Sequence, residues 1–160
     1  MARVFGSSIK RREDPSLITG AGKYTDDLKL PNMLYAAIVR SPHAHARIPS
    51  IDTSKATALE GVTAVFTGED IKKSGTPGVV PVGWLLPDMK IPPHPVLASE
   101  TVRYVGDAVA VVVAEDRYRA QDAVDLVEVE YDPLPVVTNP AKTVEEGAPQ
   151  LHAEATNNIA

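Results

Sequence analysis

Cysteine does not occur in this 160-residue sequence. Without a thiol, the chain can form no disulfide, and it can hold neither a thiolate zinc site nor a cysteine-ligated iron–sulfur cluster. Any redox chemistry in which this protein takes part must therefore be supplied by another group or by another chain.

An excess of positive charge and a long apolar run are also missing. The 16 Lys and Arg residues are outnumbered by 21 Asp and Glu and form no basic block, which argues against nucleic acid as a partner. No run approaches the ~18 apolar residues that a membrane span needs, and residues 1–12 lack the apolar stretch of a secretory signal. We therefore expect a cytoplasmic protein without a membrane span.

The composition is otherwise that of one ordinary domain, since 44% of the residues are hydrophobic and this length can build a real core. Residues 1–32 are polar and turn-rich and predict an extended N-terminal arm. Residues 33–138 hold the apolar runs of the core, within which residues 74–95 form a proline-rich loop. Residues 139–160 return to the composition of a loop.

Two apolar runs dominate the core. Residues 33–39 have the length of a buried strand. Residues 108–114, A-V-A-V-V-V-A, are the most apolar run of the chain and predict a central strand buried on both faces. Between them, residues 62–67 predict a short strand and residues 68–73 a turn of helix.

The clearest helix prediction covers residues 116–127. Ala120, Ala123, Val124 and Val127 recur at the spacing of one helix face, and we expect the first three to pack on the strand at 108–114. Residues 127–132 then alternate apolar and charged side chains, which predicts a strand with one wet face. Together these segments predict a mixed α/β sheet with short β-α-β segments.

The stretch R-S-P-H-A-H-A-R-I, residues 40–48, holds two of the four histidines. In an extended backbone His43 and His45 share a face, as two metal ligands do, but a zinc site needs three or four ligands and no third one stands nearby. We expect instead a strand end that docks on other domains or subunits through the side chains of Arg40, His43, His45 and Arg47.

The proline-rich loop carries the only tryptophan, Trp84, followed by two leucines. These side chains are costly to leave in water, so we expect the loop to be a docked surface as well. His94 and His152 lie beside prolines or near the end of the chain, and we expect both to be exposed and without a special role.

Other motifs carry little chemistry. G-A-G-K at residues 20–23 lacks the first glycine and the final Ser or Thr of a phosphate-binding loop, and a turn is the better interpretation. Asp26 and Asp27 form a carboxylate pair in a polar arm, typical of solvated or turn-capping residues. A small hydrolase would need a nucleophile, a base and an acid in one pocket, and no such set is present. The residues alone therefore define no active site.

Four separated blocks together resemble one family. Residues 7–48, ending in R-S-P-H-A-H-A-R-I, are similar to the start of the large, molybdenum-binding subunit of the xanthine dehydrogenase and aldehyde oxidase family, particularly its aerobic carbon-monoxide-dehydrogenase-type members. The blocks P-V-L-A-S-E-T-V-R-Y-V-G-D-A-V-A-V-V-V-A-E-D, A-Q-D-A-V-D-L-V-E-V-E-Y-D-P-L-P-V-V and P-Q-L-H follow in the same order. The loop at residues 74–95 departs most from the family.

The resemblance implies an α/β-hammerhead domain, the N-terminal module of a longer subunit in which molybdenum is held through the sulfurs of its pterin. The cofactor-binding segments and the catalytic glutamate of the family lie after residue 160, so no catalytic, cofactor-binding or metal-binding residue is assigned here. The partners implied are the molybdopterin-binding remainder of the large subunit, toward which residues 139–160 would lead, an iron–sulfur small subunit with [2Fe–2S] clusters and an FAD-carrying medium subunit.

Two hypotheses of different class follow. The first is a domain of a molybdenum hydroxylase, acting on an aldehyde, an N-heterocycle such as xanthine, or carbon monoxide, and catalytically inert alone. The second is a free-standing interaction module that uses the hammerhead fold to bind a protein partner. A reading frame that continues beyond residue 160 would favour the first.

Overall fold

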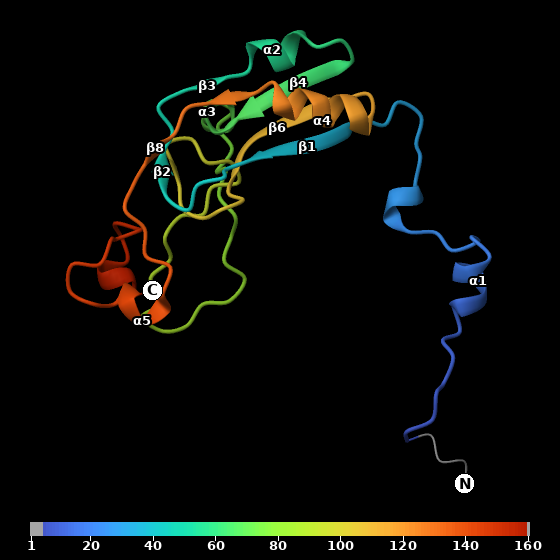
Figure 1. Ribbon diagram of the computed structural model, residues 1–160, viewed down its shortest axis with the longest axis horizontal. Helices are drawn as coiled ribbons and strands as arrows, with labels where there is room; N and C mark the ends of the chain where they lie inside the picture. Colours follow the sequence, from blue (N-terminus) through green and yellow to red (C-terminus); the bar gives the residue numbers. More distant parts are fainter. Residues whose placement is uncertain (1–4, 160) are drawn as a thin grey trace. The chain divides into compact units, whose positions relative to one another are not determined.

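The structure is a computed structural model that describes residues 5–159. Contacts within the chain separate two units, Met1–Met33 and Leu34–Ala160, and each is described here by itself. Figure 1 traces the chain through its helices and strands.

The first unit contains two short helical segments and no buried residue within them. Helix α1, Asp14–Ile18, has a proline in its first turn, where the missing N–H leaves no hydrogen bond unmade. The 3₁₀ helix η1, Thr25–Asp27, is closed by the Asp27 carboxylate, which accepts a hydrogen bond from the backbone N–H of Tyr24 at 2.9 Å. The predicted extended arm therefore also contains local helical turns.

The second unit is built on a three-stranded sheet in the order β1-β6-β4. Strand β6, Ala108–Ala114, lies between β1, Tyr35–Arg40, and β4, Val62–Thr67, and runs antiparallel to both. The predicted bounds of the central strand at 108–114 and of the strand at 62–67 are confirmed. The predicted burial of the central strand on both faces was wrong, because Val111 and Val113 are only half-buried.

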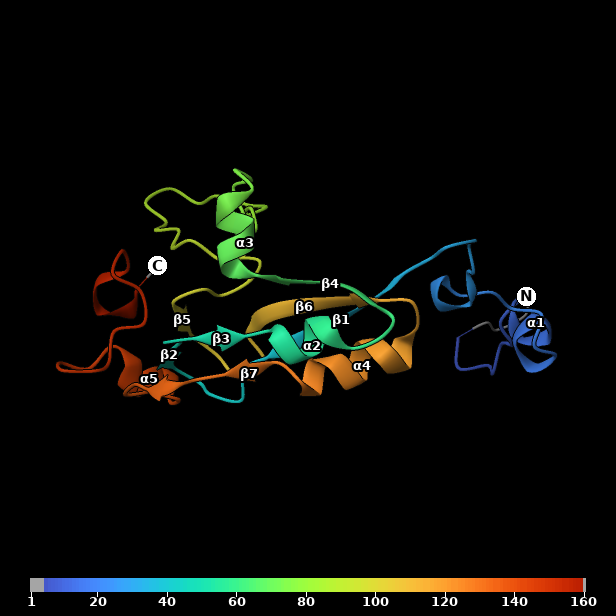
Figure 2. The ribbon, with the colours of Figure 1, turned by 90° about the horizontal axis from the view of Figure 1, so that it is seen from above.

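Helices α4, Arg117–Asp125, and α2, Ser54–Ala58, cover one face of this sheet (Figure 2). Ala56 of α2 and Ala123 of α4 are fully buried against Val112 of β6, and Val62, Val65 and Val124 pack around them. The predicted packing of α4 is confirmed, since Ala120 and Ala123 are buried and the half-buried Val124 also packs against the cluster. The helix ends two residues before the predicted Val127.

A second layer of short strands forms two small sheets. The order β5-β2-β8 joins Thr101–Val102, Ala46–Arg47 and Asp132–Pro133, and β3, Ile51–Asp52, pairs with β7, Glu128–Val129. Their core consists of buried residues at the junction with β6: Ala46, Ile48, Ala98, Val102 and Val109.

Three sequence predictions about the sheets were wrong in detail: the mixed sheet, the buried strand at 33–39 and the continuous strand at 127–132. The described strand pairs are all antiparallel, so the sheet is not mixed, because the chain after α4 leaves β6 and pairs β7 with β3 instead. The segment at 33–39 is not a buried strand, because β1 is an edge strand covered on one face, and Ala36 and Ile38 are exposed.

The predicted strand at 127–132 is interrupted: β7 covers Glu128–Val129, and β8 begins only at Asp132 and ends at Pro133. The pairing partner of this segment, residues 46–52, contains Pro49, which has no N–H to donate to a ladder. The register changes by one residue between the β2–β8 pair and the β3–β7 pair. One long ribbon thus becomes two short ones.

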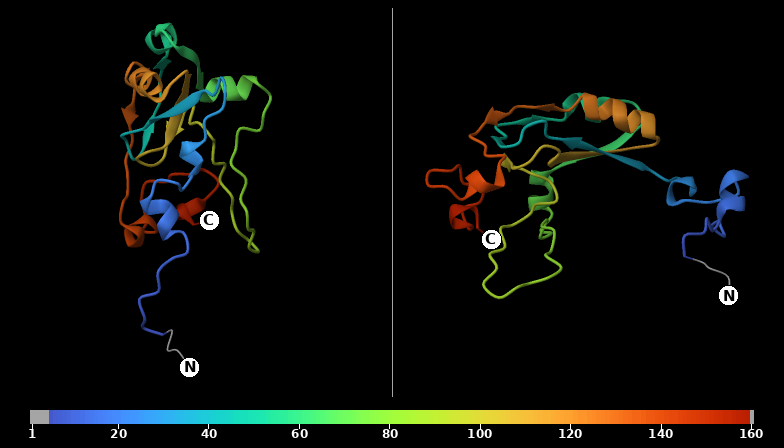
Figure 3. Two further views of the ribbon diagram at one scale, coloured as in Figure 1. Left: turned by 90° about the vertical axis from the view of Figure 1, so that its right-hand side faces the viewer. Right: turned by 60° about the horizontal axis from the view of Figure 1, so that its bottom comes forward.

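Helix α3, Gly68–Lys73, is found where it was predicted. It begins the long connection between β4 and β5. Its first turn is closed by Thr67 and Asp70, which form a capping box. The loop that follows is held at its base by an antiparallel bridge between Val79 and Pro95. Figure 3 shows this loop, together with α5, Pro140–Thr143, and η2, Thr156–Asn158, on the side of the sheet away from α2 and α4.

Candidate docking surface

The segment after β1 is fixed by a buried serine. Ser41 is 2% exposed, its N–H donates to the Asp107 carbonyl at 2.9 Å, and its carbonyl accepts from the Gly106 N–H at 2.8 Å. Arg40 Nη1 also donates to the Gly106 carbonyl at 2.8 Å. Gly106 has a φ of 92°, a backbone conformation that favours glycine. The turn before β6 thereby anchors the histidine-containing segment.

The two histidines of this segment have separate partners within the domain. The His43 N–H donates to Ser41 Oγ at 3.0 Å, and its ring lies 4.8 Å from the Tyr131 ring, tilted by 52°. His45 Nδ1 lies 2.8 Å from the Pro135 carbonyl oxygen, and because a carbonyl can only accept, this nitrogen carries the proton. Both rings therefore support the pairing of β2 with β8.

A metal centre is not formed at these histidines. Within residues 5–159, no group of three His, Cys, Asp or Glu side chains is placed to hold a metal ion. Arg47 lies beside them on β2 and pairs with Asp132 at 3.9 Å, both side chains being largely exposed. A docking role for Arg40, His43, His45 and Arg47 stays a prediction.

The proline-rich loop exposes large apolar side chains. Trp84 is 77% exposed, Leu85 64% and Leu86 61%. Isolated apolar side chains are normal on a surface, but a contiguous group that includes tryptophan is typical of an interaction site. Among residues 5–159, no neighbouring segment buries these three side chains.

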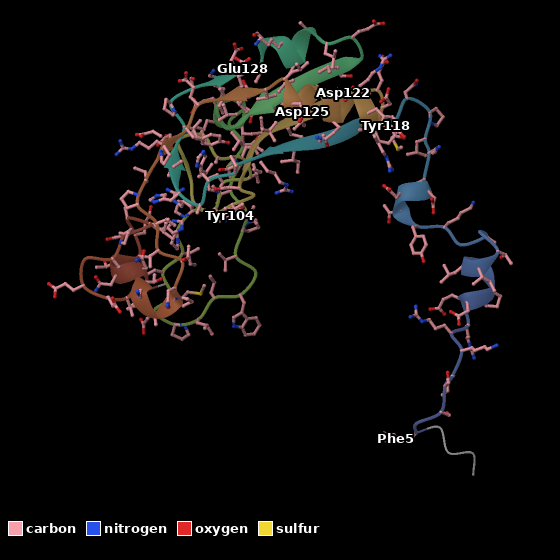
Figure 4. The ribbon with its side chains drawn as sticks, in the orientation of Figure 1. Phe5, Tyr104, Tyr118, Asp122, Asp125 and Glu128 are labelled. Atoms are coloured by element: carbon pink, nitrogen blue, oxygen red, sulfur yellow. The ribbon has the colours of Figure 1, made fainter. Side chains whose placement is uncertain are left out.

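A polar cluster near the base of the loop was missed in the sequence. It lines a cavity of about 50 Å³ and consists of Pro93, His94, Pro95, Arg103, Tyr104, Asp107 and His152. Asp107 is buried and accepts from the Arg103 N–H at 3.0 Å, and Arg103 Nε donates to the Leu151 carbonyl at 3.1 Å. Figure 4 labels Tyr104 at this end of the domain.

The expectation for His152 was wrong, whereas His94 is exposed as expected. Burial, and then the positive charge of Arg103, lowers the pKa of the His152 imidazole from its ordinary value of 6.5. Its Nδ1 atom is buried without a hydrogen-bond partner. Burial, together with the Asp107 carboxylate, raises the pKa of the Tyr104 hydroxyl. The only sequence signal for the cluster was the buried-strand prediction at 108–114, directly after Asp107.

Neither of the two cavities described in the domain is large enough for a pterin cofactor. The cavity beside His152 measures about 50 Å³, and a second one, between α3 and the loop, about 120 Å³. Sites for small organic ligands usually measure roughly 300 Å³ or more.

Comparison with known proteins identifies the domain. Residues 19–135 match the family described as aldehyde oxidase and xanthine dehydrogenase, a/b hammerhead domain. The chain belongs to this family. The α/β-hammerhead fold expected from the sequence is therefore confirmed, with antiparallel sheets.

Relatives of the hammerhead chain are much longer proteins. The carbon monoxide dehydrogenase large chain of Afipia carboxidovorans is 48% identical over 155 residues, which are 97% of this chain and 18% of that protein. The xanthine dehydrogenase molybdenum-binding subunit of Escherichia coli O157:H7 is 41% identical over 138 residues, 84% of this chain and 18% of that protein.

A solved relative has the same fold. The crystal structure of quinoline 2-oxidoreductase from Pseudomonas putida 86 superposes with a TM-score of 0.78 at 42% identity and covers 91% of this chain and 18% of its own. The hammerhead chain thus spans about 18% of the length of these relatives. No helix within residues 5–159 is long and apolar enough to cross a membrane.

Proposed function

We propose that this chain is the N-terminal structural and assembly domain of the large subunit of a molybdenum-dependent oxidoreductase, and that it is catalytically inert alone. The observation that carries the proposal is the match of 97% of the chain, at 48% identity, to only 18% of a carbon monoxide dehydrogenase large chain. The exposed apolar loop around Trp84 supports it, because such a surface needs a cover.

The cofactors and partners of the parent enzyme are part of this proposal. Molybdopterin would be held by the remainder of the large subunit, and [2Fe–2S] clusters and FAD by a small and a medium subunit. The absence of cysteine in this chain agrees with clusters held elsewhere. The reaction would be oxidation of a small substrate: carbon monoxide, an aldehyde or an N-heterocycle, in a cytoplasmic complex.

The proposed division of the chain follows these roles. Residues 1–32 would be an arm that lies on a neighbouring part of the enzyme, residues 33–138 the hammerhead core, and residues 139–160 the passage toward the molybdopterin-binding domain. Arg40, His43, His45 and Arg47 would contribute to docking through their exposed atoms. Trp84 would contribute most, since large buried aromatic side chains dominate interface energies.

Substitution of Trp84 tests the docking role. We expect Trp84→Ser, made in the gene that encodes this chain and purified through a tag at the native locus, to reduce the amount of copurifying subunits. The stability of the domain itself should change by no more than ~0.5 kcal/mol, because the side chain is largely exposed. The readouts are subunit stoichiometry and molybdenum content.

Tyr118 provides a matched control, because it is 84% exposed and lies on α4, where Figure 4 labels it. Tyr118→Ser should leave subunit stoichiometry unchanged. Equal stoichiometry in the Trp84→Ser complex and the unsubstituted complex would overturn the docking role. Absence of molybdenum from the unsubstituted complex would overturn the proposed function.

A further inference from the structure

The three-stranded sheet is covered by helices on one face only. Side chains of directly paired residues in neighbouring strands share a face. On one face lie the paired rows Ala37–Val112–Val65 and Tyr35–Ala114–Val62. This is the face that α2 and α4 cover, and Val112 and Ala114 are fully buried there.

The other face consists of two rows of apolar side chains. Ile38, Val111 and Phe66 form one row, and Ala36, Val113 and Ala64 form the other. We call these six residues the open face. Ile38 is 42% exposed and Phe66 43% exposed, Ala36 is exposed, and the other three are half-buried.

An open face without a polar side chain is unusual for an antiparallel sheet. Such sheets normally alternate hydrophobic residues toward the core with polar residues toward water. Here both alternations of β6 are apolar, Val111 and Val113 on one side and Val112 and Ala114 on the other. A strand that is apolar on both sides is typical of a sheet that is covered on both faces.

We propose that the open face is covered by apolar side chains from the remaining part of the same large subunit, so that the sheet becomes the middle layer of a three-layer arrangement. The inference rests on the proposed function and deepens it by naming a surface and its occupant. The open face carries no charge with which to select a separately encoded partner. Apolar surfaces of this kind are typical of permanent contacts rather than of exchanging ones.

Covalent linkage also favours the remainder of the large subunit as the segment that covers the open face. About four fifths of the length of the relatives lies outside the matched region, since the match covers 18% of them. A segment linked covalently to the domain has a far higher effective concentration at the open face than a separate chain. The loop at 74–95, with its exposed Trp84, projects on the same side of the sheet (Figures 1 and 3), and so it would border the same contact.

Site-specific photocrosslinking in the assembled enzyme tests the inference. We would replace Phe66 by p-benzoylphenylalanine in the full-length large subunit, purify the complex, irradiate it and identify crosslinked peptides by mass spectrometry. Ile38→p-benzoylphenylalanine gives a second position in the same row, in case the first variant does not fold. Tyr118→p-benzoylphenylalanine on the helix-covered side reports background crosslinking. Molybdenum content is measured in each preparation.

The expected result is crosslinked peptides that join position 66 or 38 to residues of the same large subunit outside residues 1–160, with the product running as one chain on a denaturing gel. A crosslink to a different subunit or to a second copy, or no crosslink above the Tyr118 background, would overturn the inference. If molybdenum is present in such a preparation, the proposed function stands while the inference fails. If molybdenum is absent from the unsubstituted complex, the proposed function itself fails.

Discussion

At the scale of single residues, Val112 and Val113 are neighbours in β6 that face opposite sides of the sheet. Val112 is fully buried against Ala56 and Ala123, and Val113 is half-buried on the open face. We expect Val112→Asp to abolish folding, because an unpaired buried carboxylate costs several kcal/mol. Thermal unfolding followed by circular dichroism measures this.

Val113→Asp serves as the control, since its carboxylate can reach water in the chain studied alone. It should retain a cooperative transition at a reduced midpoint temperature. A soluble Val112→Asp chain that unfolds cooperatively would show that the sheet faces have been assigned incorrectly, and so would equal damage from the two substitutions.

His152 makes stability depend on pH. Because burial and Arg103 lower its pKa from 6.5, the folded chain binds the proton less readily than the unfolded chain. The unfolded state is therefore favoured progressively as the pH falls below the unfolded value of 6.5, and the stabilisation is fully present only above it. We therefore expect the midpoint temperature of unfolding to fall when it is measured at decreasing pH between about 8 and 5.

His152→Gln should flatten the pH dependence of the midpoint temperature in that range, because it removes the group that is protonated more readily in the unfolded chain. The carboxyl groups of Asp52, Asp70 and Glu100 have pKa values lowered from 3.8, 3.8 and 4.5 and act at lower pH. An undiminished pH dependence in His152→Gln would exclude this histidine as its source.

At the scale of elements, helix α4 depends on its N-terminal cap. The Asp116 carboxylate accepts from the backbone N–H groups of Tyr118 and Arg119, each at 2.9 Å. We expect Asp116→Ala to lower the free energy of unfolding by ~1 kcal/mol, with a usual range of about 0.5–2 kcal/mol. Denaturant unfolding measures the difference.

Asp122→Ala is the matched control, because Asp122 is an exposed residue of α4 that caps nothing. Its effect should be smaller than that of Asp116→Ala. Equal effects of the two substitutions would indicate that loss of negative charge, and not loss of the cap, causes the destabilisation.

The elements that could be predicted from sequence are those with a local signal. Strand β6 was marked by an uninterrupted apolar run, and α4 by helical spacing behind the cap at Asp116. The antiparallel topology could not be predicted, because strand direction depends on which distant segments pair. The exposure of Ile38 could not be predicted either, since an apolar run does not report whether one face or both are covered within the domain.

The residues of the candidate docking surface also fall into those that the sequence could predict and those that it could not. The exposed Trp84 could be anticipated from a tryptophan in a proline-rich loop. The partners of His43 and His45, which are Tyr131 and Pro135, lie about ninety residues further along the chain, and no local pattern connects them. The same holds for His152, which the fold places beside Arg103 and Asp107 from more than forty residues further along the chain.

At the scale of the whole molecule, the domain is defined by surfaces that it does not cover itself. The loop around Trp84 and the open face of the β1-β6-β4 sheet are both apolar and exposed. Both are explained if the hammerhead domain folds as one layer of a larger enzyme and contributes its packing, rather than its chemistry.

The most direct test of this account is the molybdenum and iron content of the complex that copurifies with the chain tagged at its native locus, determined by elemental mass spectrometry together with the intact mass of the tagged polypeptide. The account predicts a polypeptide several times longer than this chain, with about one molybdenum and about four iron atoms, as two [2Fe–2S] clusters require. A metal-free chain of 17.1 kDa would contradict it.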